Sequence, residues 1–138
     1  MTSALTDEQR TTLDQAVKFA EESSGLEFAV MLVDKPDVQD PRREAETVFA
    51  QLGLPSRPAV MIYVNTVDRV IEILTASEVE DRLSNVTCEE AVTLMTGLFA
   101  LDDLAGGLTR GVEYLADRAG VGEQTGADLP NIIDTDEL

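Results

Sequence analysis

Two apolar runs, separated by a segment of helix length, constrain the fold of this chain most strongly. Residues 27–33 (EFAVMLV) and 59–64 (AVMIYV) carry one charge between them, as expected of strands in a sheet that is covered on both faces. Between the two runs, Asp40 and Pro41 form the N-cap and the first position of a predicted helix. Strand, helix and strand in this order make a right-handed crossover, so we expect the two strands to be parallel.

A third strand is predicted directly after the second. Residues 65–68 (NTVD) are typical of a turn, so residues 69–74 (RVIEIL) should pair with the preceding strand as an antiparallel hairpin. The sequence thus predicts an α/β fold. It is a small mixed β-sheet, with a parallel crossover and an antiparallel hairpin strand, and with helices on both faces in an α/β/α sandwich.

Capping residues predict the helices that flank this sheet. Thr6 and Gln9 form a capping box for a first helix, and Gly25 ends it. After the hairpin, we expect Ser77 to cap a short helix through Leu83.

Two longer helices are predicted to follow. Thr87 is expected to cap the first, and residues 103–119 should form the second. Gly106, Gly107 and Gly111 interrupt the leucine stripe of the second helix, although each interior glycine costs ~1 kcal/mol relative to alanine. Because Gly107 and Gly111 share one face, they predict a close approach to the sheet or to the neighbouring helix.

The chain of 138 residues is the size of one domain. We place this domain over residues 1–119 and interpret residues 120–138 as a flexible acidic C-terminal tail, because glycine and acidic side chains are frequent there. Leu129, Ile132 and Ile133 provide enough apolar surface for part of the tail to dock as a short extended piece.

Charge excludes two classes of partner. The sequence has 27 acidic and 10 basic residues, a net charge of −17, whereas nucleic acid and anionic membranes require a basic surface. The acidity is consistent with cation binding or a basic partner, but a solvated, self-repelling surface is the simpler interpretation. The N-terminus shows no apolar signal core, and no apolar run approaches the length of a membrane span. We therefore expect a cytoplasmic protein.

Several catalytic chemistries lack the residues that they require. The sequence has no histidine and one cysteine, Cys88, which excludes His-based triads, His-ligated zinc and an internal disulfide. It also lacks the glycine motifs that bind nucleotide phosphates. Cys88 is expected near a helix N-terminus, where a thiolate is favoured, but Glu89 and Glu90 beside it favour a packed structural thiol.

Oxygen ligands offer one further possibility. Asp34 and Asp37 lie with Asp40 in one loop, and calcium or magnesium prefers such oxygens. Pro36 breaks the spacing of a calcium-binding loop, and Asp40 is needed as a helix cap. We therefore predict no metal or cofactor, and keep Asp34 and Asp37 as the candidates for calcium or magnesium.

The order of elements and several short segments resemble the TPM domain family, whose members include a thylakoid acid phosphatase-like protein. The likeness extends from about residue 5 to residue 119 and is carried by residues 5–10 (LTDEQR), 25–30 (GLEFAV), 59–70 and 103–115. The last of these resembles the closing glycine-containing helix of the family. The sequence is most similar to a small soluble actinobacterial branch without assigned function.

Two motifs of that family are missing. Members usually carry Lys-Gly-x-Asp-Asn-Gly before the second strand and Gly-Tyr-Gly after the third, at one end of the sheet. Here residues 56–58 (SRP) and 75–77 (TAS) occupy those places. The resemblance implies a cleft at that end, to which metal binding and phosphatase activity are attributed in some members. The candidate cleft residues of this chain are Arg57, Thr75, Ser77, Glu78, Arg82 and Asp103.

These observations lead to two hypotheses of function. The leading one is a non-catalytic TPM-like domain that binds a protein partner, because the fold pattern is intact and the motifs of the cleft are lost. The alternative is a divalent-metal-dependent phosphatase that uses carboxylates of a remodelled cleft, such as Glu78 and Asp103.

Overall fold

A computed structural model gives the structure of the protein and describes residues 4–122 and 132–134, with the backbone alone at Asp134. The helices are α1 (Asp7–Ser24), α2 (Pro41–Gln51), α3 (Asn85–Phe99) and α4 (Leu104–Ala119), with short 3₁₀ turns η1 (Leu54–Ser56) and η2 (Ser77–Val79). The strands are β1 (Glu27–Val33), β2 (Ala59–Asn65), β3 (Val70–Thr75) and β4 (Ile132–Asp134).

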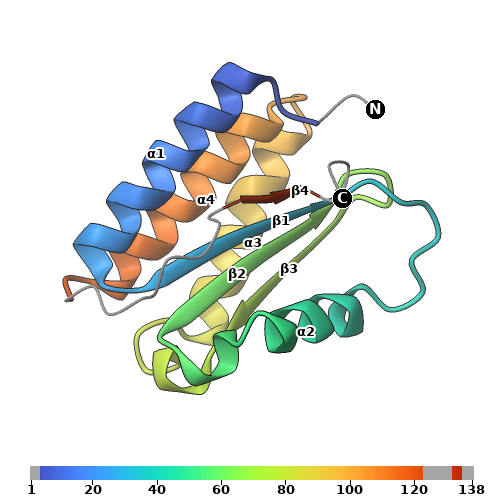
Figure 1. The fold of residues 1–138 in the computed structure, drawn as a ribbon. Helices are drawn as coiled ribbons and strands as arrows, with labels where there is room; N and C mark the ends of the chain where they lie inside the picture. The colour runs from blue at the N-terminus through green and yellow to red at the C-terminus, as the bar shows by residue number, and fades with distance from the viewer. Residues whose placement is uncertain (1–3, 123–131, 135–138) are drawn as a thin grey trace.

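The strands form one mixed sheet in the order β3-β2-β1-β4. β1 and β2 are parallel, with Glu27 opposite Ala59, while β2 and β3 form the antiparallel hairpin. Helix α2 covers one face, and α1, α4 and α3 form a layer in that order on the other (Figure 1). The predicted α/β fold with a mixed sheet and helices on both faces is therefore confirmed. Figure 1 also shows α1 and α4 running in the same direction, with α3 antiparallel to them.

The fourth strand comes from the segment that was predicted as a tail. Ile132 and Ile133 pair in parallel with Val30 and Met31 of β1, and Ile132 is buried. The apolar surface of these isoleucines allowed an extended piece to dock, and the structure shows Ile132 and Ile133 docked in this way. Leu129, like residues 123–131 as a whole, lies outside the described residues, so the flexibility predicted for the tail stays a prediction.

Every residue of β1 and β2 is buried, which explains why both runs lack the alternating pattern of a half-exposed strand. Asp40 accepts a hydrogen bond from the amide of Arg43, and Pro41 begins α2 as predicted. The capping box of Thr6 and Gln9 is also present. Within the described residues, each helix is either too short or too polar to cross a lipid bilayer.

Two predicted helix starts are wrong. The amide of Ala76 still donates to the carbonyl of Ala59, so the chain stays in the sheet until η2, and Ser77 begins one 3₁₀ turn in place of a helix through Leu83. Helix α3 begins earlier than expected, because Ser84 is its cap and accepts a hydrogen bond from the amide of Thr87. Thr87 thus lies within the first turn of α3.

Gly107 and Gly111 of α4 face α3, as the shared-face argument predicts. A β-carbon built at Gly111 would lie 2.5 Å from Sδ of Met95, and one at Gly107 would lie 2.6 Å from Cδ1 of Phe99. The neighbours are side chains of α3 and not its backbone. Small residues at these two positions therefore allow the side chains of α3 to pack onto α4.

Candidate functional site

The end of the sheet where β2 begins and β3 ends holds the predicted cleft. Thr75 pairs with Val60 across the hairpin, and the amide of Ala76 lies 2.9 Å from the carbonyl oxygen of Ala59. Residues 56–58 and 75–77 therefore meet at one end of the sheet, as predicted. Ser77 and Glu78 are exposed on η2 at this end.

Arg57 is held by an internal ion pair at this end. Its Nη1 lies 3.1 Å from Oε2 and 3.2 Å from Oε1 of Glu27, and Glu27 is only 5% exposed. Removing either partner of such a pair would leave a charge uncompensated. The guanidinium of Arg57 is thus held through Nη1 at the start of β1, where its charge is compensated by Glu27.

Arg82 joins the ends of two helices. Its Nε donates to the carbonyl oxygen of Ala119 at 2.9 Å, and its Nη2 donates to those of Ser24 at 2.7 Å and Gly120 at 3.0 Å. Carbonyls at helix C-termini lack partners within the helix and carry partial negative charge. The planar guanidinium therefore serves as a clamp between the C-termini of α1 and α4.

Asp103 does not belong to this end of the molecule. Its Oδ1 accepts a hydrogen bond of 2.9 Å from the amide of Gly106 and caps the N-terminus of α4. Helix α4 is 16 residues long, or about 24 Å at 1.5 Å per residue, and Arg82 contacts its other end. Asp103 is therefore separated from the other candidate cleft residues, and it cannot share a phosphate or a metal with Glu78.

The acidic loop lies at the opposite end of the sheet, between β1 and α2. The carboxylate of Asp68 accepts hydrogen bonds from the amides of Asp37 at 3.1 Å and Val38 at 2.9 Å. Asp37 has a positive φ of 60°, and Asp40 caps α2. Among the described residues, no three His, Cys, Asp or Glu side chains gather to hold a metal ion, at this loop or elsewhere.

Sequence reasoning missed a partly buried network beside this loop. The hydroxyl of Tyr63, a side chain that is fully buried in β2, donates to Oε2 of Glu44 at 2.5 Å. Lys35 donates to the other oxygen of Glu44 at 2.6 Å. Burial alone would raise the pKa of Glu44, but the hydrogen bonds from Lys35 and Tyr63 outweigh it and lower this pKa. Burial and Glu44 raise the pKa of Tyr63 far above its ordinary value.

Arg42 and Cys88 also serve the structure. Arg42 donates to the carbonyl oxygen of Ile73 on the edge strand β3 at 2.9 Å and lies 3.5 Å from Glu72. Cys88 is half-buried in α3, and this burial raises the pKa of its thiol. A raised pKa disfavours the nucleophilic thiolate, in agreement with the predicted structural thiol.

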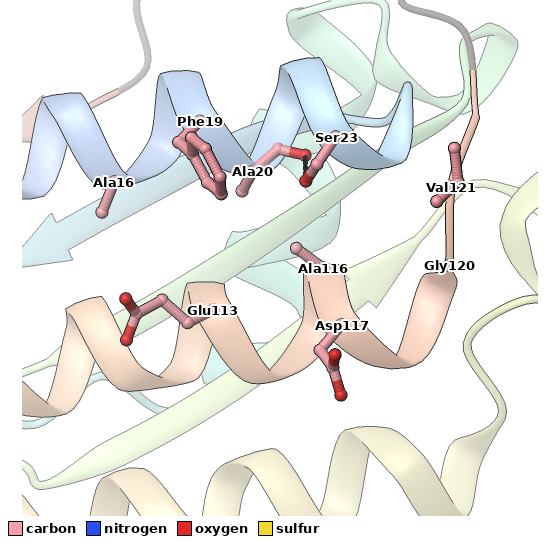
Figure 2. A pocket seen from close by; sticks show the side chains of 9 residues that line it. All are labelled: Ala16, Phe19, Ala20, Ser23, Glu113, Ala116, Asp117, Gly120 and Val121. Carbon is pink, nitrogen blue, oxygen red and sulfur yellow. Dashed lines mark hydrogen bonds between the residues drawn. The ribbon is translucent and has the colours of Figure 1, made fainter.

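A groove between α1 and α4 remains open (Figure 2). It has a volume of about 560 Å³, and Phe19 at its side is 72% exposed. It exists because small side chains line it on both helices and cannot fill the space between them. The lining residues are Ala16, Phe19, Ala20, Ser23, Glu113, Ala116, Asp117, Gly120 and Val121.

Sequence reasoning did not identify this groove. Phe19 lies outside the apolar stripe of α1 that faces the core, and an aromatic residue at such a position is the signal that could have indicated a surface site. The spacing of α1 and α4 depends on Arg82 and on the core, so no local pattern predicts it.

The fold and these sites define a small α/β domain with a four-stranded sheet, arginines that are held by internal partners at the cleft end, and an apolar groove between α1 and α4. The family model of the TPM domain matches residues 1–118. The chain therefore belongs to the TPM domain family, as the resemblance implied. No curated protein matches it in sequence.

Solved structures from three bacteria share the fold. The BA42 protein of the psychrophilic bacterium Bizionia argentinensis is 22% identical with a TM-score of 0.82, and the match covers 94% of each chain. An N-terminal domain from P. gingivalis is 16% identical with a TM-score of 0.76, over 83% of this chain and 76% of that one. The N-terminal domain of cg2496 from Corynebacterium glutamicum is 13% identical with a TM-score of 0.69, over 90% and 78%. At these identities the likeness concerns the fold alone.

Proposed function

We propose that the chain is a non-catalytic TPM domain that binds a protein partner without a cofactor, and that the groove between α1 and α4 receives this partner. The main support for the proposal is that two apolar side chains of the groove are exposed to solvent. Phe19 is 72% and Val121 is 95% exposed on either side of small residues. A large aromatic residue beside a hollow is typical of surfaces that bury apolar anchors of a partner.

The cleft residues favour a binding role over catalysis. A phosphatase must gather positive charge or metal ions around a phosphate. At the cleft end, Arg57 is paired with Glu27 and Arg82 with carbonyl oxygens. The two carboxylates considered for the phosphatase, Glu78 and Asp103, lie at different ends of the molecule.

Site-specific photocrosslinking in the source cells tests the proposal. A photoreactive benzoylphenylalanine replaces Phe19 in one variant and Val67 in a matched control, because Val67 is 47% exposed on the distant hairpin turn. We expect one adduct of defined mass at position 19 and none of that mass at position 67.

A second variant shows whether the adduct depends on the groove. Ala16 lines the groove, so Ala16→Arg should fill it and abolish the adduct while the circular dichroism spectrum is unchanged. The captured partner, once purified, should bind the wild type and lose at least about tenfold in affinity for Ala16→Arg, as expected when a central anchor is blocked. Equal adducts at positions 19 and 67, or an adduct that persists in Ala16→Arg, would contradict the proposal.

A further inference from the structure

We infer that the partner of the groove presents a basic amphipathic segment, in which Lys or Arg side chains flank a bulky apolar anchor. This inference rests on the proposed docking function and adds the chemistry of the partner. It is carried by the charges of the lining. Glu113 and Asp117 are its charged members, and both are acidic.

Both carboxylates that line the groove belong to α4. Glu113 and Asp117 are four residues apart on this helix, and Figure 2 shows the carboxylate of Asp117 pointing away from α1, so that Glu113 is the acidic group nearer to the space between the helices. The side chain of Glu113 is 58% exposed, and its ion pair with Arg110 is long, at 3.9 Å, and solvated. An exposed pair of this kind contributes little, so Glu113 is available to a cation of a partner.

The charge around the groove supports the same conclusion. Lys18, the lysine of α1, already lies 3.3 Å from Asp14, and the whole chain has a net charge of −17. A field of this sign attracts a basic segment and repels an acidic one, and it repels an anionic membrane equally. The partner is therefore a protein with a basic face.

The apolar part of the groove specifies the anchor. Phe19 and Val121 stand exposed beside Ala16, Ala20 and Ala116, which leave room for side chains of another molecule. A helix that lays its apolar face into a groove places anchors at positions three and four apart. Leucine, methionine or phenylalanine at these positions, with lysine or arginine beside them, matches the lining of this groove.

Synthetic peptides test the charge before any partner has been isolated. The probe is an amphipathic helical peptide of leucine and lysine, and the matched peptides replace each lysine with glutamine or glutamate. We expect the lysine peptide to perturb the amide resonances of Phe19, Ala116 and Val121. Binding should weaken in the order lysine, glutamine, glutamate, and the preference for lysine should shrink as salt is added.

Charge variants then locate the effect. Glu113→Gln with Asp117→Asn should weaken the lysine peptide about fivefold, as expected for two exposed pairs, and leave the glutamine peptide unchanged. Asp34→Asn with Glu89→Gln removes the same charge from exposed positions outside the lining and should change neither affinity by more than about twofold, since salt screens distant charges.

The outcomes separate the two proposals. If the glutamine peptide binds the groove as well as the lysine peptide, the docking site stands and the basic partner is wrong. If Asp34→Asn with Glu89→Gln weakens binding of the lysine peptide as much as the double variant of the groove does, net charge alone causes the binding. The inference of a basic partner is then also wrong. If no peptide perturbs the resonances of the groove and Phe19→Ser leaves the affinity for the captured partner unchanged, the docking function itself is wrong.

Discussion

Nη2 of Arg82 lies 2.7 Å from the carbonyl oxygen of Ser24, a residue 58 positions earlier in the chain. The same guanidinium binds the carbonyls of Ala119 and Gly120. The relative position of α1 and α4, and with it the groove between them, thus depends on a side chain that belongs to neither helix. Arg82 was a candidate residue of the cleft, but its hydrogen bonds hold the ends of two helices together.

Arg82→Met should therefore destabilise the protein markedly. The substitution keeps an extended side chain but removes three hydrogen bonds from a charged donor, so we expect a loss of about 2–4 kcal/mol in the free energy of unfolding. Chemical denaturation measures it. Arg110→Met is the control, because Arg110 makes one exposed ion pair and should change stability by less than about 0.5 kcal/mol. If the two variants lower the free energy of unfolding equally, the hydrogen bonds of Arg82 do not stabilise the fold.

Local patterns were sufficient to predict most of the elements. The capping box at Thr6 and the Asp40-Pro41 start of α2 depend on residues within one helical turn, and both are present. The start of α3 was misplaced because Ser84 and Thr87 both offer a capping hydroxyl, and their hydroxyls lie only 3.2 Å apart. Sequence alone gives no reason to prefer one of two such neighbours.

The candidate site was harder to predict than the fold. Residues 56–58 and 75–77 were correctly placed at one end of the sheet, because a hairpin reverses the chain direction. Asp103 was misplaced, since its position follows from the direction of α4 and the packing of α1 on it. The hydrogen bond of Tyr63 to Glu44 spans 19 residues and two elements. A hydroxyl in a buried strand indicates that some partner exists, but not which one.

Acid should weaken the network around Glu44. The pKa of Glu44 is lowered in the folded state from an ordinary value of 4.5. Its contribution to stability is therefore complete above pH 4.5 and is lost as the pH falls through the lowered pKa of the folded protein. We expect the stability difference between the wild type and Glu44→Gln to shrink below pH 4.5 in urea unfolding. Glu46→Gln is the control, because Glu46 is 59% exposed and lies 3.9 Å from Arg42. An unchanged difference down to about pH 3, well below the ordinary carboxyl pKa, would contradict the assignment.

The wild type should hydrolyse a generic phosphomonoester no faster than a variant that lacks the two carboxylates considered for a phosphatase. Glu78→Gln with Asp103→Asn removes both charges, and an asparagine side chain can still cap α4, so the fold is retained. Because the two residues lie at different ends of the molecule, we expect equal turnover for the two proteins with calcium, with magnesium or without metal. Metal-stimulated turnover that the double variant abolishes would establish the phosphatase instead.

Alanine in place of the α4 glycines tests the packing of α4 on α3. A methyl group at Gly107 meets the ring of Phe99, and one at Gly111 meets the buried thioether of Met95. Overpacking costs about 1–3 kcal/mol, which exceeds the gain of up to ~1 kcal/mol in helix propensity. Both variants should lower the melting temperature. Gly107→Ala should lower it more, because the rigid ring of Phe99 is harder to displace than the flexible side chain of Met95. Gly97→Ala is the control within α3, since a β-carbon there meets nothing within 4 Å, and it should raise the melting temperature. If all three variants raise the melting temperature by a similar amount, no close packing exists at Gly107 and Gly111.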